Sequence, residues 1–252
     1  MGANDSIDKA RRGFEASFSE KMFYDIQTYD DEHLQRIMKA LDIQDDYQVL
    51  DLGTGSGFLA FPLAERFPES QITGLDILPQ TLARDVEKAN TLNITNLRFI
   101  CYDGKAFPFD DDSFDVIVSR YCLHHFPDIE KTFGEIARVL KLDGQFFISD
   151  PTPNNDDSRR FVDTYMQMKD DGHNKFYTKD EFVRLAENAG LKLESCFDTH
   201  IRFPRKSVDA YRKIAEGVDE GIIAGYDIKI ADGQVFITEK VLNLSFRKAA
   251  SR

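Results

Sequence analysis

Residues 49–57 of the chain are Val-Leu-Asp-Leu-Gly-Thr-Gly-Ser-Gly, an apolar run that carries one acid and continues into three alternating glycines. The acid is Asp51, and the glycines are Gly53, Gly55 and Gly57. Glycine lets the backbone turn sharply and approach a ligand closely. Because a helical pattern follows, we expect a strand, a tight turn and a helix, with a nucleotide-type ligand over the carboxyl end of the strand.

Short apolar runs alternate with helical patterns after residue 47. They predict strands, with helices between them, at 48–52, 71–76, 97–102, 114–120 and 144–150. The clearest helix is expected at 129–140, and the Lys-Leu-Asp-Gly run at 141–144 predicts a helix stop and turn. Such alternation favours a parallel sheet that is covered on both faces. The expected fold is α/β, Rossmann-like and doubly wound, with a mostly parallel seven-stranded sheet.

Helical patterns at 6–23 and 31–41 predict N-terminal helices, and we expect residues 1–45 to form a helical lid by analogy, because an N-terminal helix often covers the ligand in proteins of this shape. Residues 46–252 are expected to form the main domain, within which 151–233 contain an inserted helical cap that selects the substrate. The expected elements of this half are helices at 158–171 and 204–224, a helix opened by a capping box at 178–181, and a strand at 191–197. Two alternating runs at 226–231 and 234–246, joined by Asp232-Gly233, predict an antiparallel C-terminal hairpin.

Three acids stand at the ends of three successive predicted strands: Asp51, Asp76 and Asp103. Asp51 suits a ligand with an ammonium group, Asp76 can accept both ribose hydroxyls, and Asp103 can accept from an adenine amine. A dinucleotide fingerprint would need a third glycine at position 58, which is Phe58. The pattern therefore favours a nucleoside with an amino-acid end over a dinucleotide with a diphosphate.

Residues 48–150 resemble the core of class I S-adenosylmethionine (SAM)-dependent methyltransferases, and most closely the branch of the ubiquinone and menaquinone C-methyltransferases. The matching segments are 49–57, 74–79, 101–109, 113–126 and 135–150. The resemblance implies SAM as cofactor and a set of contacts that runs from its methionine end through the ribose and adenine to the sulfonium: Asp51, Gly53, Thr54, Gly55, Gly57, Asp76, Ile77, Asp103, Gly104, Ser119 and Arg120. Residues 121–126 depart from the quinone enzymes, which argues against a quinone acceptor.

Three residues are candidates for a direct part in catalysis. His124 and His125 follow the fourth predicted strand, where either could act as a general base or could instead cap a helix or pack under the sheet. Tyr24 precedes the core and could place its ring on the sulfonium, or could belong to ordinary packing. We expect no metal, because no H-x-x-x-H pattern is present.

Composition narrows the classes of partner. The net charge of −12 and the lack of a clustered basic run argue against nucleic acid, and no apolar run approaches the ~20 residues that span a bilayer. Three cysteines without C-x-x-C spacing, Cys101, Cys122 and Cys196, predict reduced, buried thiols of a cytoplasmic protein.

The leading hypothesis is a methyltransferase that acts on a small molecule at an O, N or C atom. The alternatives are an NAD(P)-dependent oxidoreductase and a non-catalytic SAM-binding protein. The sequence leaves the acceptor open, and it does not decide between a monomer and a homodimer.

Overall fold

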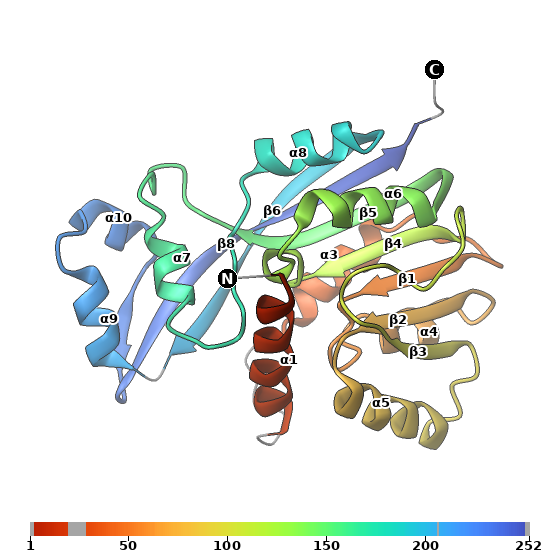
Figure 1. Ribbon diagram of the computed structural model, residues 1–252, viewed down its shortest axis with the longest axis horizontal. Helices are drawn as coiled ribbons and strands as arrows, with labels where there is room; N and C mark the ends of the chain where they lie inside the picture. Colours follow the sequence, from red (N-terminus) through yellow and green to blue (C-terminus); the bar gives the residue numbers. More distant parts are fainter. Residues whose placement is uncertain (1–2, 20–28, 206, 250–252) are drawn as a thin grey trace.

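The computed structural model describes residues 3–19, 29–205 and 207–249, which form one mixed sheet flanked by helices (Figure 1). The main path of the sheet has the order β3-β2-β1-β4-β5-β8-β6, and a short β7 pairs with β8. The pairs among β1 to β5 are parallel, whereas β8 is antiparallel to both β5 and β6. The strands are β1 (Gln48–Leu52), β2 (Gln71–Asp76), β3 (Leu97–Cys101), β4 (Phe114–Arg120), β5 (Leu140–Thr152), β6 (Leu191–Arg205), β7 (Lys229–Ala231) and β8 (Gln234–Lys248). The expected Rossmann-like sheet is confirmed.

Helices cover both faces of the sheet, which explains why its strands are nearly continuous apolar runs. Neighbouring residues of β1 face opposite ways: Val49 packs with α3 and α4, and Leu50 packs in the cluster that contains α6 and α8. The described helices are α1 (Ala3–Ser19), α3 (Asp31–Ala40), α4 (Ala60–Arg66), α5 (Pro79–Thr91), α6 (Ile129–Val139), α7 (Phe161–Met166), α8 (Lys179–Asn188), α9 (Val208–Ala215) and α10 (Glu220–Gly225).

The long strands β6 and β8 run past the core sheet and carry α7, α9 and α10 at their far ends (Figure 1). A separate apolar cluster joins these helices to Val235 and Ile237 of β8. This region corresponds to the expected cap, whose role in substrate selection stays a prediction. The tip of β7 and β8 is the expected hairpin: Asp232 and Gly233 both have positive φ, 51° and 72°, as a two-residue turn of this hand requires.

Several expected elements were wrong in extent, among them the strand expected at 191–197, which continues to Arg205 as β6. The helix at 204–224 is two helices, because Gly217 between them has a φ of +76°. The helix at 158–171 is only α7, since Arg160 before it is left-handed with a φ of 60°. The turn at 141–144 is a bulge inside β5, where pairing with β4 shifts between Phe114↔Leu140 and Val116↔Gln145.

A capping box opens α8 as expected. The Thr178 hydroxyl accepts from the Glu181 N–H at 3.3 Å, and the Glu181 carboxylate accepts from the Thr178 N–H at 2.9 Å. We expect Thr178→Ala to lower the free energy of unfolding by about 1 kcal/mol, because an N–H group at the helix start loses its acceptor. Urea denaturation measures this as a lower midpoint at an unchanged slope. Thr178→Ser keeps the hydroxyl and should match the parent; equal midpoints for all three proteins would contradict the prediction.

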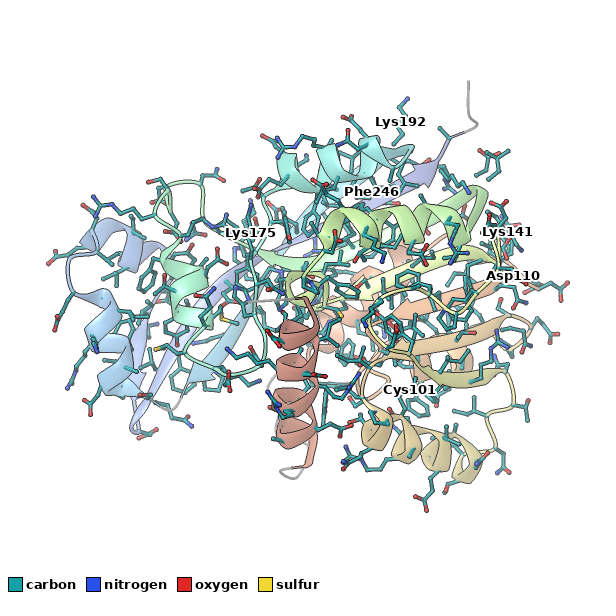
Figure 2. All side chains as sticks on the ribbon, in the orientation of Figure 1. Cys101, Asp110, Lys141, Lys175, Lys192 and Phe246 are labelled. Carbon is teal, nitrogen blue, oxygen red and sulfur yellow. The ribbon has the colours of Figure 1, made fainter. Side chains whose placement is uncertain are left out.

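The cysteines are free, but the expectation that all are buried was wrong. Cys101 and Cys196 are exposed, because they lie on β3 and β6, the two edge strands of the sheet (Figure 2 labels Cys101). Among the described residues, no helix has the length and apolar character needed to cross a membrane.

Candidate active site

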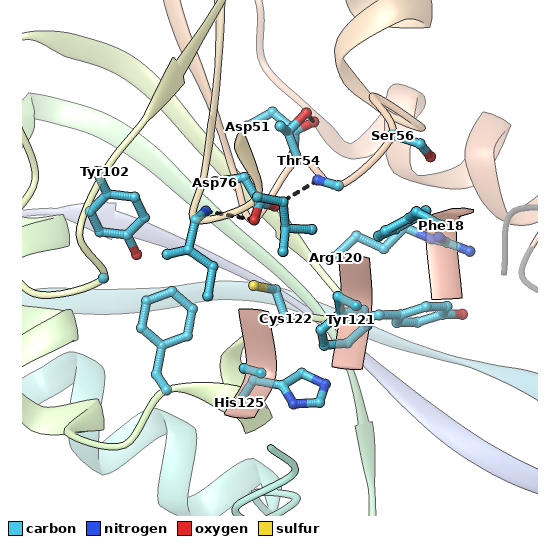
Figure 3. Close-up of a pocket in the computed structure, with 18 of the residues that line it drawn as sticks. Phe18, Asp51, Thr54, Ser56, Asp76, Tyr102, Arg120, Tyr121, Cys122 and His125 are labelled. Carbon is cyan, nitrogen blue, oxygen red and sulfur yellow. Dashed lines mark hydrogen bonds between the residues drawn. The ribbon is translucent and has the colours of Figure 1, made fainter. Parts of the chain in front are cut away.

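A pocket of about 950 Å³, its open mouth included, lies at the carboxyl ends of β1, β2 and β4 (Figure 3). Helix α1 forms one wall through four residues that recur at helical spacing: Ile7, Ala10, Phe14 and Phe18. Polar contacts to several segments fix α1 there, including one from the Gln80 N–H to Glu15. Arg11 donates from Nε to the Ile77 carbonyl at 3.0 Å, and Lys9 pairs with Asp170 at 2.7 Å. The position of α1 is consistent with the expected N-terminal lid.

The bend after β1 needs glycine for two separate reasons. Gly53 and Gly55 have φ values of 74° and 54°, in the left-handed region. A Cβ on Gly53 would also lie 2.0 Å from the Cys122 sulfur, so no larger residue fits. The bend is anchored to β2, because the Gly53 N–H donates to the Leu75 carbonyl at 2.8 Å. This hydrogen bond holds the backbone of the bend against β2, where Gly53 and Gly55 line the pocket.

Two buried carboxylates flank the bend. Asp51 accepts from the Thr54 hydroxyl at 2.7 Å, and Asp76 accepts from the N–H groups of Gly55 and Ile77 at 2.8 and 2.7 Å. Burial raises the pKa of Asp51 to about 7, with Asp76 adding to the effect and the Thr54 hydroxyl opposing it. Burial likewise raises the pKa of Asp76 to about 6 against the two N–H bonds. Each oxygen has a second lone pair, so both carboxylates can still bind a ligand.

The pocket lining also includes a cation, Arg120. The Arg120 guanidinium lies between two rings, 3.8 Å from the centroid of Phe58 and 3.9 Å from that of Tyr121. Asp51 pairs with Val118 in the sheet, and Arg120, two positions further along β4, projects from the same face. The two rings fix the plane of the guanidinium, and Figure 3 shows Arg120 next to Tyr121 in the pocket that Asp51 and Asp76 also line.

His125 lines the pocket beside α1. The Phe14 ring of α1 contacts the His125 ring edge-on, at a centroid distance of 4.8 Å. Its Nδ1 is buried and has no hydrogen-bond partner among the described residues. Burial and then the neighbouring His124 hold the pKa of His125 well below its usual value. The ring is therefore neutral at neutral pH, the form that can accept a proton.

The structure brings most of the expected site residues to the pocket. Those that line it are Asp51, Gly53, Thr54, Gly55, Asp76, Ile77, Gly104, Arg120 and His125. Tyr24 lies outside the described residues. Four others lie nearby but do not line it: Gly57, Asp103, Ser119 and His124.

Each of these four side chains or backbones has another local role. Gly57 has a φ of +75°, and a Cβ there would meet the Phe61 ring at 2.6 Å. Asp103 is exposed and accepts from the Lys105 N–H at 2.9 Å, while Ser119 is buried and donates to the Leu52 carbonyl at 3.0 Å. His124 is buried against Asp150, with its Nδ1 on that carboxylate. The wall residues Tyr102 and Cys122 were not expected from the sequence.

The strand order of the sheet, with the glycine bend at the carboxyl end of β1, is that of the class I SAM-dependent methyltransferase fold. A family model described as a methyltransferase domain matches residues 43–215. The chain belongs to this family of class I SAM-dependent methyltransferases.

The chain is 33% identical to the uncharacterized methyltransferase YcgJ of Bacillus subtilis over 143 residues. These residues are 56% of this chain and 56% of that protein. It is 37% identical over 106 residues to the demethylmenaquinone methyltransferase of Thermus thermophilus, 42% of this chain and 48% of that protein. It is 32% identical over 119 residues to phosphoethanolamine N-methyltransferase 2 of Caenorhabditis elegans, 47% of this chain and 27% of that protein. The chain thus spans about half the length or less of these curated relatives.

The fold is also that of a crystal structure of a putative methyltransferase from Bacillus halodurans. The two agree with a TM-score of 0.77 over 87% of this chain and 100% of that chain, at 21% identity. At this identity the likeness concerns the fold.

Proposed function

We propose that the chain binds SAM in this pocket and transfers its methyl group to a small-molecule acceptor. The observation that carries the proposal is the pair of buried carboxylates, Asp51 and Asp76, on either side of a bend that only glycine can form. In this proposal Asp76 accepts from the ribose hydroxyls, and Asp51 pairs with the ammonium of the methionine end. The adenine lies against Tyr102, Ile77 and Gly104, which line the same pocket.

In this proposal Arg120 binds the carboxylate of the methionine end of SAM. The methionine end of SAM carries its ammonium and its carboxylate on one carbon. Asp51 and Arg120 lie on one face of the sheet, so the acid can pair with the ammonium while the guanidinium pairs with the carboxylate. Arg120 suits the carboxylate because its plane is fixed between two rings, and a fixed guanidinium loses little freedom on binding.

Decarboxylated SAM isolates this contact. We expect Arg120→Gln to weaken SAM binding about tenfold, since a charged hydrogen bond is lost, and to leave decarboxylated SAM almost unchanged. Isothermal titration measures both ligands. Arg98→Gln is the control, because Arg98 lies on β3 and donates to the Thr73 hydroxyl away from this pocket. Equal weakening of both ligands by Arg120→Gln would remove the assignment.

The proposal of a small acceptor rests on the shape and charge of the site. The pocket is walled by α1 and the bend, and the protein carries a net charge of −12, which disfavours a polyanionic substrate. Two of the relatives are named for small acceptors, demethylmenaquinone and phosphoethanolamine. Departures at residues 121–126 argue against a quinone for this chain.

Methyl transfer needs alignment, exclusion of water and, for many acceptors, removal of a proton. SAM supplies an activated methyl group when it is bound. The chain would hold the acceptor against the wall of Tyr121, Cys122 and His125, and α1 would keep water out. Neutral His125 is the proton acceptor in this proposal. The Nδ1 atom of His124 is bonded to the Asp150 carboxylate, so in this proposal His124 supports the loop and does not take the proton.

Radiolabelled SAM and a low-molecular-weight metabolite extract test the function. Label that moves into small metabolites supports the proposal. A non-catalytic SAM-binding protein would bind SAM and S-adenosylhomocysteine in a titration yet transfer no label. An NAD(P)-dependent oxidoreductase would instead enhance NADH fluorescence, which Phe58 in place of the third glycine disfavours.

A further inference from the structure

Behind His125 lies a second imidazole that the proposed reaction has not used. His173 follows α7 in the cap, and its ring centroid is 6.1 Å from that of His125, with the planes nearly perpendicular. Its side chain is almost fully buried, and its Nδ1, like that of His125, has no hydrogen-bond partner among the described residues. Two buried, unpartnered nitrogens on adjacent rings are costly unless they serve a purpose.

The tautomer of His173 follows from its other nitrogen. Nε2 lies 2.9 Å from an oxygen of Asp163. Burial alone would raise the pKa of Asp163, but hydrogen bonds from His173, the Phe176 N–H and Arg160 together lower it. The carboxylate is therefore ionised and can only accept, so Nε2 of His173 carries the hydrogen. Neutral His173 then has a bare lone pair at Nδ1, held in place as in a His–Asp dyad.

Hydrogen bonds from Asn174, the residue after His173, fix the separation of the two histidines. The Asn174 N–H donates to the His124 carbonyl at 2.9 Å, and the Asn174 side chain donates to the His125 carbonyl at 2.7 Å. The cap segment that bears His173 is thus bonded directly to the loop that bears His125. The His124 ring lies against both, with centroid distances of 4.1 Å to His125 and 5.4 Å to His173, but its Nδ1 is engaged by Asp150.

We propose that Asp163 and His173 extend the acceptor site inward as a proton relay, in which His125 takes the proton of the acceptor at Nε2 and passes its Nδ1 proton through one water molecule to Nδ1 of His173. The acceptor is then a compound with an O–H or N–H group that loses its proton on methylation. This inference rests on the proposed methyl transfer at the same site.

The bonds balance without a further reactant. The acceptor atom forms a bond to the methyl carbon, and the carbon–sulfur bond breaks with its electron pair left on sulfur. The acceptor proton moves to His125, and the proton displaced from Nδ1 reaches His173 by way of the water. The product state is an imidazolium at His173 beside ionised Asp163, which stabilises its charge.

Initial rates of label transfer from radiolabelled SAM into the metabolite extract, measured against pH, test the relay. His125→Gln should slow transfer about 100-fold, the usual effect of losing a general base. His173→Gln should slow it at least about tenfold and move the acidic limb of the pH profile. The double variant should be no slower than His125→Gln, since both act on one proton path.

Several charged groups surround the relay and bear on the pH profile: His124, Asp150, Asp163, Asp171, Arg160 and Lys169. The control is His200→Gln, because His200 is an exposed histidine on β6 and should leave rate and profile unchanged. All variants should bind S-adenosylhomocysteine as the parent does. An unchanged profile in His173→Gln, or effects that multiply in the double variant, would overturn the relay.

Nitrogen-15 NMR of the histidine rings separates this inference from the proposed function, because it needs no acceptor. In the complex with S-adenosylhomocysteine, we expect His173 protonated at Nε2 and bare at Nδ1, and His125 protonated at Nδ1. A proton on Nδ1 of His173 in the neutral ring would refute the relay even if methyl transfer is intact. Loss of all methyl transfer in the parent protein, with these tautomers present, would count against the proposed function alone.

Discussion

Asp76→Ala should weaken SAM binding by about 100- to 10,000-fold. The carboxylate is proposed to accept from two ribose hydroxyls, and hydrogen bonds to a charged group contribute about 1.5–3 kcal/mol each. The same side chain also accepts from the N–H groups of Gly55 and Ile77, so its loss loosens the bend that shapes the pocket. Isothermal titration with SAM and with S-adenosylhomocysteine should show the same loss, since both carry the ribose.

Two further variants make this experiment specific. Asp76→Asn keeps the shape and one acceptor oxygen, so its affinity should fall between those of the parent and Asp76→Ala. Asp103→Ala removes the acid at the end of the neighbouring strand, whose exposed side chain accepts from the Lys105 N–H. It should change affinity by less than about threefold, because a solvated hydrogen bond contributes little. An Asp76→Ala protein that stays folded and binds SAM normally would remove the basis of the proposed cofactor site.

The affinity for SAM should fall about 100-fold between pH 7.5 and pH 5.5, with about 25-fold from Asp51 and about fourfold from Asp76. Burial raises the pKa of Asp51 to about 7, and only the ionised carboxyl can pair with the ammonium of the ligand. Above pH 7 the ionised form dominates and binding is strongest. Below pH 7 the ionised fraction falls about tenfold per unit, and affinity is lost as pH falls through that value.

Asp51→Asn provides the control for this pH dependence. The variant should bind more weakly at pH 7.5 and show a much flatter profile, with only the smaller contribution of Asp76, whose pKa is raised to about 6. S-adenosylhomocysteine should follow the same curve, because it shares the ammonium. A parent profile that stays flat over this range would mean that Asp51 does not meet the ligand as a carboxylate.

The core of the fold could be predicted because its signals are local. Most of the parallel strands are short apolar runs bounded by polar residues or glycine, and the bend at Gly53 and Gly55 needs a conformation that glycine adopts easily. Asp51 and Asp76 could be placed at one edge for the same reason, since the carboxyl ends of parallel strands meet there. The antiparallel β8 could be predicted from its hairpin turn.

The surroundings of the other site residues depend on contacts that the spacing of residues in the sequence does not show. Asp51 and Asp76 lie within the ends of their strands, whereas Asp103 lies after β3, and its side chain accepts a competing local bond from the Lys105 N–H. His124 and His125 are neighbours in a short 3-10 turn, which sends one toward Asp150 and the other to the pocket. The importance of His173 arises only when the cap folds back against residues 124 and 125.

The two fifteen-residue strands, β6 and β8, belong to the core and to the cap at once. Leu244 and Phe246 of β8 pack in the core, and Val235 and Ile237 of the same strand pack under the cap helices. Neither region can lose its strands while the other keeps them, so heating should produce a single calorimetric peak. For protein engineering, it follows that grafting the cap of a relative onto this chain must preserve the pairing register of both strands along their whole length.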